Sequence, residues 1–98
     1  MSLRLDPKLG ATVLCFSAID ERHNRTGEWA KTWGKDFAVT GITQVAVCKL
    51  PQESGVNLLC LDGQGHVILD SAHESISEAR AHAEREYRGL SNTWQSAL

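Results

Sequence analysis

The arrangement of apolar and polar residues is most regular in the second half of the chain. Two short runs, 56–61 and 66–70, are apolar at nearly every position and rich in residues that favour strands. The four residues between them begin with Asp62 and end with Gly65. An Asp that opens a type I turn bonds back to the backbone, and a Gly three positions later accepts the positive φ of a bulge. The pattern predicts a β-hairpin, and its uninterrupted apolar runs place that hairpin inside a sheet and not at its edge.

A helix is predicted directly after the hairpin. Ser75 and Glu78 have the spacing of a capping box, in which the serine accepts from the glutamate amide and the carboxylate reaches back. Apolar residues then recur every three or four positions, on one helical face: Ile76, Ala79, Ala83 and Tyr87. Gly89 follows as a left-handed cap. The predicted helix therefore spans 76–88, and the two alanines of its stripe favour close packing on a sheet.

The first half of the chain supplies two more predicted strands. Residues 11–19 form an apolar run with a β-branched and aromatic centre, and 42–50 predicts a strand that turns into the hairpin. The fold class is α+β. We expect an antiparallel sheet of three to four strands, made of the meander 42–70 and the extra strand at 11–19. The C-terminal helix 76–88 covers one face of this sheet.

The segment 28–39 allows two interpretations. Trp29, Trp33 and Phe37 are four positions apart, so they share one face in a helix and also in a strand. Gly34 weakens both alternatives. We expect a short helical turn over 28–33, followed by extended chain.

Length, charge and cysteines restrict the class of protein. A chain of 98 residues is expected to form a single domain, 1–98, and a net charge of −2 argues against a general nucleic-acid binder. The three cysteines lie in apolar runs without metal-ligand spacing, which predicts buried, reduced thiols and a cytoplasmic protein. The histidines show no ligand spacing either, so we expect neither a metal nor a cofactor. Without an apolar run near 18 residues or a signal segment, we expect no membrane association.

One cluster of polar residues, at the junction between the last strand and the helix, has acid–base potential. Asp70 and His73 are the candidates for an alternative ligand or enzymatic site. A hydrolase triad is assembled from distant segments and needs an exposed nucleophile with an oxyanion hole. Here the nearby Ser75 is already explained as a helix cap. The sequence therefore favours binding over catalysis.

A second cluster combines tryptophans with lysines. Trp29, Lys31, Trp33 and Lys35 are interleaved, which suits stacking of single-stranded nucleic acid. Tryptophans in a small domain are more often core residues or anchors of protein interfaces. We therefore expect at least one of the two indoles to be partly exposed and to bind a protein partner. A second copy of the chain is the simplest partner, because a two-fold dimer needs one patch only.

The C-terminal third of the chain also carries a resemblance. Residues 70–94 contain Asp70, then His-x-Ser before the capped helix, then an Ala-Glu…Glu-aromatic run and Trp94. This order resembles the tail of small uncharacterised bacterial single-domain proteins, and it implies no activity. The strand–strand–strand–helix layout is similar to the HicB-type antitoxin domain, which implies a partner protein that is neutralised or scaffolded. The chain departs from that domain because its meander has no Pro-Gly signature.

Overall fold

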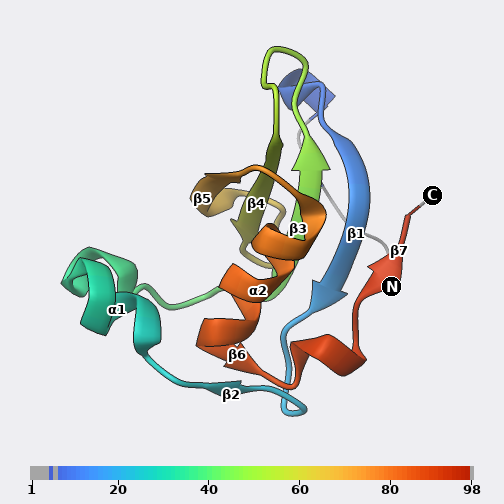
Figure 1. Ribbon diagram of the computed structural model, residues 1–98. Coiled ribbons are helices and arrows are strands. Elements are labelled where there is room, and N and C mark those ends of the chain that lie inside the picture. Colours follow the sequence, from blue (N-terminus) through green and yellow to red (C-terminus); the bar gives the residue numbers. More distant parts are fainter. Residues whose placement is uncertain (1–4, 6, 98) are drawn as a thin grey trace.

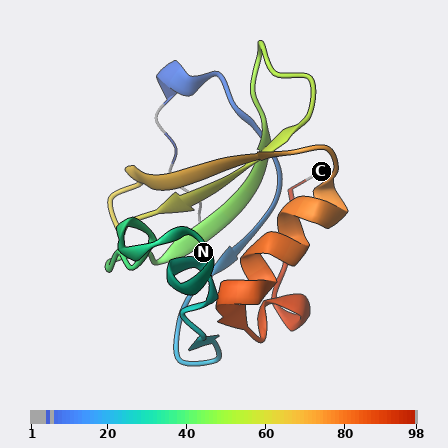
Figure 2. The same cartoon turned by 60° about the vertical axis from the view of Figure 1, so that its left-hand side comes forward.

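The computed structural model of the protein describes Leu5 and residues 7–97. A five-stranded antiparallel sheet with the order β5-β4-β3-β1-β7 carries helix α2 across one face (Figures 1 and 2). The bounds of these elements are β1 (Thr12–Ala18), β3 (Gln44–Lys49), β4 (Val56–Leu61), β5 (Val67–His73), α2 (Ile76–Glu86) and β7 (Gln95–Ser96). The α+β class and the meander are confirmed, whereas the sheet has one strand more than the three to four predicted.

Short elements connect these strands. They are η1 (Pro7–Leu9), β2 (Asn24–Arg25), α1 (Glu28–Trp33), η2 (Lys35–Phe37), β6 (Tyr87–Arg88) and η3 (Leu90–Asn92). Strands β2 and β6 form a separate antiparallel pair, which joins the start of α1 to the end of α2. The helical turn at 28–33 is confirmed. The extended chain predicted after it is wrong, because a 3-10 turn follows directly.

The predicted position of the hairpin is corrected. Strand β4 is internal and buried along its whole length, but β5 is the edge strand of the sheet. Asp70 and Ala72 are exposed on β5, so its second half alternates as an edge strand does. The uninterrupted apolar run ends at Leu69, and β5 continues to His73 beyond it. Asp70 therefore lies in the middle of the strand and not at its end.

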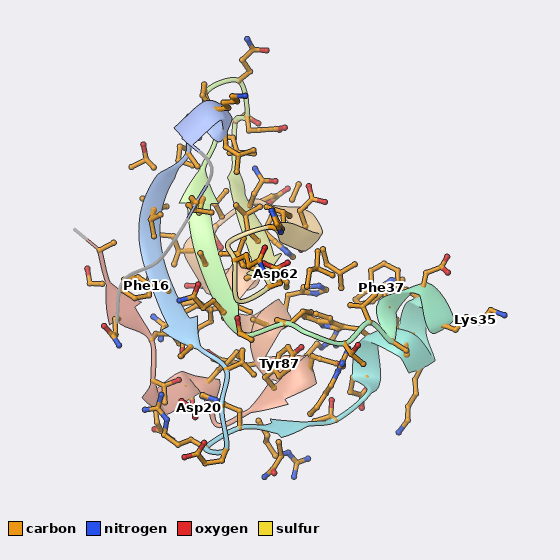
Figure 3. All side chains as sticks on the ribbon, turned by 180° about the vertical axis from the view of Figure 1, so that it is seen from behind. Phe16, Asp20, Lys35, Phe37, Asp62 and Tyr87 are labelled. Atoms are coloured by element: carbon orange, nitrogen blue, oxygen red, sulfur yellow. The ribbon has the colours of Figure 1, made fainter. Side chains whose placement is uncertain are left out.

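Each face of the sheet has an apolar cluster. Ala79 and Ala83 of α2 are fully buried against the first face, as the stripe predicted, and Tyr87 stays buried although the helix has ended at Glu86. Ile76 is 38% exposed, so the stripe does not extend to the start of the helix. The second face, which Figure 3 views, buries a smaller cluster with Phe16 of β1 packed against it. Its buried members are Ala46, Cys48, Leu59 and Leu61.

The helix cap is confirmed, with one difference. The Ser75 hydroxyl accepts from the Glu78 amide at 3.1 Å, as expected. The Glu78 carboxylate accepts from the amide of Glu74, one residue before the cap, at 3.1 Å. Gly89 has a φ of 103°, in the left-handed region, but it caps the start of η3 and does not end α2. The helix ends earlier because Tyr87 is extended and pairs with β2.

The three cysteines are free and buried, as predicted. Burial raises the pKa of the Cys60 thiol to about 12 and that of Cys48 to about 11. Burial also raises the pKa of Cys15. Thiols with raised pKa values carry little thiolate at neutral pH, so these side chains are core residues and not nucleophiles.

The turn of the β4–β5 hairpin has the predicted chemistry. The Gly65 amide donates to the Asp62 carbonyl oxygen at 3.1 Å, and the Asp62 amide donates to the His66 carbonyl oxygen at 3.0 Å. The Asp62 carboxylate also accepts from the Gln64 amide at 2.8 Å. Gly65 has a φ of 87°, which favours glycine.

Replacing Gly65 with valine is expected to lower the free energy of unfolding by about 1–2 kcal/mol, because a β-branched side chain is strained at this φ. Urea denaturation of the Gly65→Val variant measures the loss. Gly63→Val in the same turn is the control, since a Cβ there meets no atom within 4 Å and Gly63 does not have a positive φ. Equal stability of the two variants would contradict the role of Gly65.

Candidate functional site

A continuous row of rings runs across η2, α1, α2 and β5. We call Phe37, Trp33, His82 and His73 the aromatic row. The ring centroids of Trp33 and Phe37 are 5.8 Å apart, those of Trp33 and His82 are 5.1 Å apart, and those of His82 and His73 are 4.9 Å apart. Trp33 is 47% exposed, so at least one of the two indoles is partly exposed, as expected. The row joins the two candidate clusters of the sequence, because His82 bridges Trp33 to His73.

Trp29 lies beneath this row, and its predicted role as a contact residue is corrected. Its side chain is only 2% exposed, so it is a core residue. The indole stacks on the His82 ring, with centroids 4.9 Å apart and an interplanar angle of 15°. Its Nε1–H donates to the His82 backbone oxygen at 3.0 Å. Trp29 therefore fixes α1 against α2 and cannot contact a partner directly.

An ion pair that is buried at Glu86 and partly exposed at Arg25 also holds α1 in place. Glu86 is 0% exposed, and its Oε2 lies 2.6 Å from Nε of Arg25 on β2. Its Oε1 accepts from the Trp29 amide at 3.0 Å. The Arg25 guanidinium also donates to the carbonyl oxygens of Phe37, at 3.2 Å, and of Val39. This pair ties the α1–η2 segment to the end of α2, and it was not predicted.

His73 and Asp70 are not brought together. The register pairs Asp70 with Leu59 and His73 with Val56, and these two partners belong to the clusters on opposite faces of the sheet. The hydrogen-bond partner of the His73 ring is Ser71, whose Oγ lies 2.8 Å from Nε2. Burial lowers the pKa of His73, although the nearby Glu78 carboxylate opposes this. The Asp70 carboxylate therefore does not orient His73 as the acid of a catalytic triad would.

The aromatic row has opposite charges at its two ends. Lys31 on α1 and Lys35 at the start of η2 are exposed beside Trp33, and Lys35 extends away from the molecule near Phe37 (Figure 3). Glu74 and Glu78 are exposed beside His73 at the other end. Asp36 is exposed at the lysine end as well, so the surface changes from weakly cationic through aromatic to acidic.

His82 was not predicted, although a signal for it exists. It directly precedes Ala83 and follows Ala79 by three positions, so it borders the buried stripe of α2. Burial, together with the smaller effects of the charges of His73 and Arg85 and against the effect of Glu86, lowers the pKa of His82 to about 4. The ring is therefore neutral at pH 7 and packs as an aromatic side chain.

We expect the fold to lose stability as the pH falls from 7 to 5. A histidine in the unfolded chain titrates near 6.5, so the unfolded state binds more protons than the folded state between pH 6.5 and 4. The expected loss is on the order of 1 kcal/mol, since the ring is partly exposed. Urea denaturation at both pH values measures it, and His82→Gln should reduce the difference. A wild type equally stable at both values would contradict the neutral ring.

Comparisons with family models, with curated proteins and with solved structures find no match for the chain. The resemblances of residues 70–94 and of the strand–helix layout therefore stay predictions. Within Leu5 and residues 7–97, no three His, Cys, Asp or Glu side chains are grouped so that they could hold a metal ion. No helix of this described part has the length and apolar character needed to cross a bilayer.

Proposed function

We propose that the protein is a non-catalytic binding module that associates with a second copy of itself through the aromatic row. The observation that carries this proposal is Trp33, an indole 47% exposed above a packed layer of rings. Large aromatic side chains on a rigid support are the commonest anchors of protein interfaces. Trp29 and the Arg25–Glu86 pair supply that support, so little ordering is required on binding.

The charges that flank the row favour a second copy as the occupant. A two-fold axis through the middle of the row places the lysine end of one subunit opposite the glutamate end of the other. Lys31 and Lys35 of each subunit then face Glu74 and Glu78 of the other subunit. A patch of this kind is self-complementary, which is the requirement for an isologous interface.

Nucleic acid and catalysis have less support. Stacking of successive bases needs several exposed aromatic faces, and the burial of Trp29 leaves Trp33 as the accessible indole of that cluster. The net charge of −2 also opposes phosphate binding. His73 is hydrogen-bonded to Ser71, and Asp70 lies on the other face of β5. These two residues with acid–base potential therefore do not share a site.

The first test is the oligomeric state of wild type and Trp33→Ala across a concentration series, measured by analytical ultracentrifugation. Loss of an interface anchor is expected to weaken the dimer by about 2 kcal/mol, which is a roughly 30-fold change in Kd. Leu9→Ala, which removes an exposed apolar side chain from η1, is the matched control and should leave the dimer unchanged.

A charge-reversal series tests the orientation. Lys31→Glu with Lys35→Glu is expected to break the dimer, and adding Glu74→Lys with Glu78→Lys is expected to restore it, because the pairs then exchange sign. A wild type that stays monomeric at millimolar concentration would overturn self-association. A dimer insensitive to Trp33→Ala would place the interface elsewhere and would also overturn the proposal.

A further inference from the structure

The two edges of the sheet differ in length. Strand β5 has seven residues, whereas β7 at the opposite border has two (Figure 1). Proteins protect long edges with proline, lysine or bulges, because the free backbone groups of an edge strand pair readily with another strand. Strand β5 contains neither proline nor lysine, and the irregularity in its pairing with β4 lies near its start, between Val67 and Leu69. Its second half therefore lacks these protections.

The direction of the backbone groups on β4 follows from one hydrogen bond. The Thr43 amide donates to the Leu61 carbonyl oxygen at 2.8 Å, so the backbone groups of Leu61 are directed away from β5. This direction alternates along an antiparallel strand. Leu59 and Asn57 therefore also direct their backbone groups away from β5, and their pairs with β5 are not hydrogen-bonded.

The residues of β5 in these two pairs are Asp70 and Ala72. Their N–H and C=O groups are consequently directed to the outer edge, and both residues are exposed. His73, the next residue, is directed inward, since a Cβ at Gly55 would lie 2.2 Å from its carbonyl oxygen. Within Leu5 and residues 7–97, no backbone–backbone hydrogen bond joins β5 to a segment other than β4.

Charge selects one register in which β5 can pair with its own copy. A two-fold axis perpendicular to the sheet makes the two strands antiparallel and places one residue on the axis. An axis at Asp70 opposes two carboxylates, and an axis at Ala72 places Asp70 opposite Glu74. Like charges directly opposite each other destabilise a sheet. An axis at Ser71 places each Asp70 opposite an uncharged Ala72.

We propose that two copies of the chain pair through β5 about a two-fold axis at Ser71, which joins their sheets into one continuous sheet. Asp70 and Ala72 of each subunit exchange N–H···O=C bonds with Ala72 and Asp70 of the other. Ser71 and His82 line the same small cavity, so this axis passes close to the middle of the aromatic row. The inference rests on the proposed self-association and adds a backbone ladder to it.

Hydrogen exchange of the ¹⁵N-labelled full chain, measured by NMR at low and high protein concentration, tests the ladder without a substitution. The Asp70 and Ala72 amides are directed to solvent in the monomer and become donors in the dimer. Their exchange is expected to slow by at least about tenfold at high concentration. The Ser71 and His73 amides, which are directed to β4, are internal controls and should exchange slowly at both concentrations.

A cysteine scan tests the register. Ser71→Cys is expected to form a disulfide-linked dimer with oxidised glutathione, because the axis opposes the two copies at a non-hydrogen-bonded pair, where side chains are closest. Asp70→Cys and Ala72→Cys are the matched controls, since each meets its own copy in one of the two rejected registers, and both should stay unlinked. Wild type should stay unlinked too, because its three cysteines are buried. A link in either control, or none in a folded Ser71→Cys variant, would overturn the proposal.

The outcomes separate this ladder from the aromatic row. A dimer that depends on Trp33 but leaves the Asp70 and Ala72 amides unprotected would overturn the ladder and keep the proposed function. Protected amides in a dimer that is insensitive to Trp33→Ala would support the ladder and overturn the row as the interface. A wild type that stays monomeric at millimolar concentration would overturn both.

Discussion

Replacing Arg25 with alanine is expected to lower the free energy of unfolding by about 3–5 kcal/mol. The substitution leaves the Glu86 carboxylate, which is buried in the wild type, without its charged partner and with the Trp29 amide as the remaining donor to its Oε1. A buried charge without its partner bears the cost of its desolvation. The guanidinium bonds to the Phe37 and Val39 carbonyl oxygens are lost at the same time.

Urea denaturation measures this effect, and the chain offers a matched control. Arg22→Ala removes a second arginine–carboxylate pair, with Asp20 at 2.9 Å, but the Arg22 side chain is largely exposed. Exposed pairs contribute little, so this variant should change stability by less than about 1 kcal/mol. Replacing both partners of the pair, as Arg25→Met with Glu86→Leu, should recover much of the loss. Similar small effects for Arg25→Ala and Arg22→Ala would contradict the structural role of the Arg25–Glu86 pair.

The parts of the fold that the sequence predicts well are those specified by nearby residues. The Ser75–Glu78 cap and the Asp62–Gly65 turn form from hydrogen bonds within four residues, so their signals survive whatever packs around them. The fifth strand has no such signal. Gln95–Ser96 is polar and pairs with Cys15 and Phe16 of β1, far away in the chain, through its backbone. Such pairing depends on where η3 directs the chain and not on side-chain pattern.

The candidate site shows the same division. Trp33 and His73 are each conspicuous in the sequence, but their connection through His82 requires α1, β5 and α2 to meet. The pair Arg25–Glu86 is separated by 61 residues, and a glutamate on a charged helix is ordinarily solvated. Its burial follows from its position, since it comes three residues after Ala83 on the face that α1 covers.

The two tryptophans of α1 illustrate why spacing alone does not assign a role. Trp29 and Trp33 are four positions apart and therefore lie on the same side of the helix. Helix α1 has only six residues, and α2 covers its first turn and leaves its last turn exposed at Trp33. No feature of the sequence near Trp29 or Trp33 shows which of the two is covered by α2.

Replacing Trp29 with alanine is therefore expected to have a second large effect, a loss of about 3–5 kcal/mol in the free energy of unfolding. The change leaves a cavity beneath His82, removes the stacked ring pair and the edge contact with Tyr87, and frees the His82 carbonyl oxygen from its indole donor. Trp33→Ala removes a side chain of the same size from the surface and should cost less than about 1 kcal/mol.

The two substitutions separate folding from association when both are measured by urea denaturation and by ultracentrifugation. Trp33→Ala should keep the stability of the monomer and lose the dimer. Trp29→Ala should lose stability, and its effect on association should follow from displacement of α1, because the indole itself reaches no partner. A Trp29→Phe variant retains most of the ring packing and should recover part of both properties. Equal stability of Trp29→Ala and Trp33→Ala would mean that Trp29 does not hold α1 on α2, and the rigid support proposed for the aromatic row would then be absent.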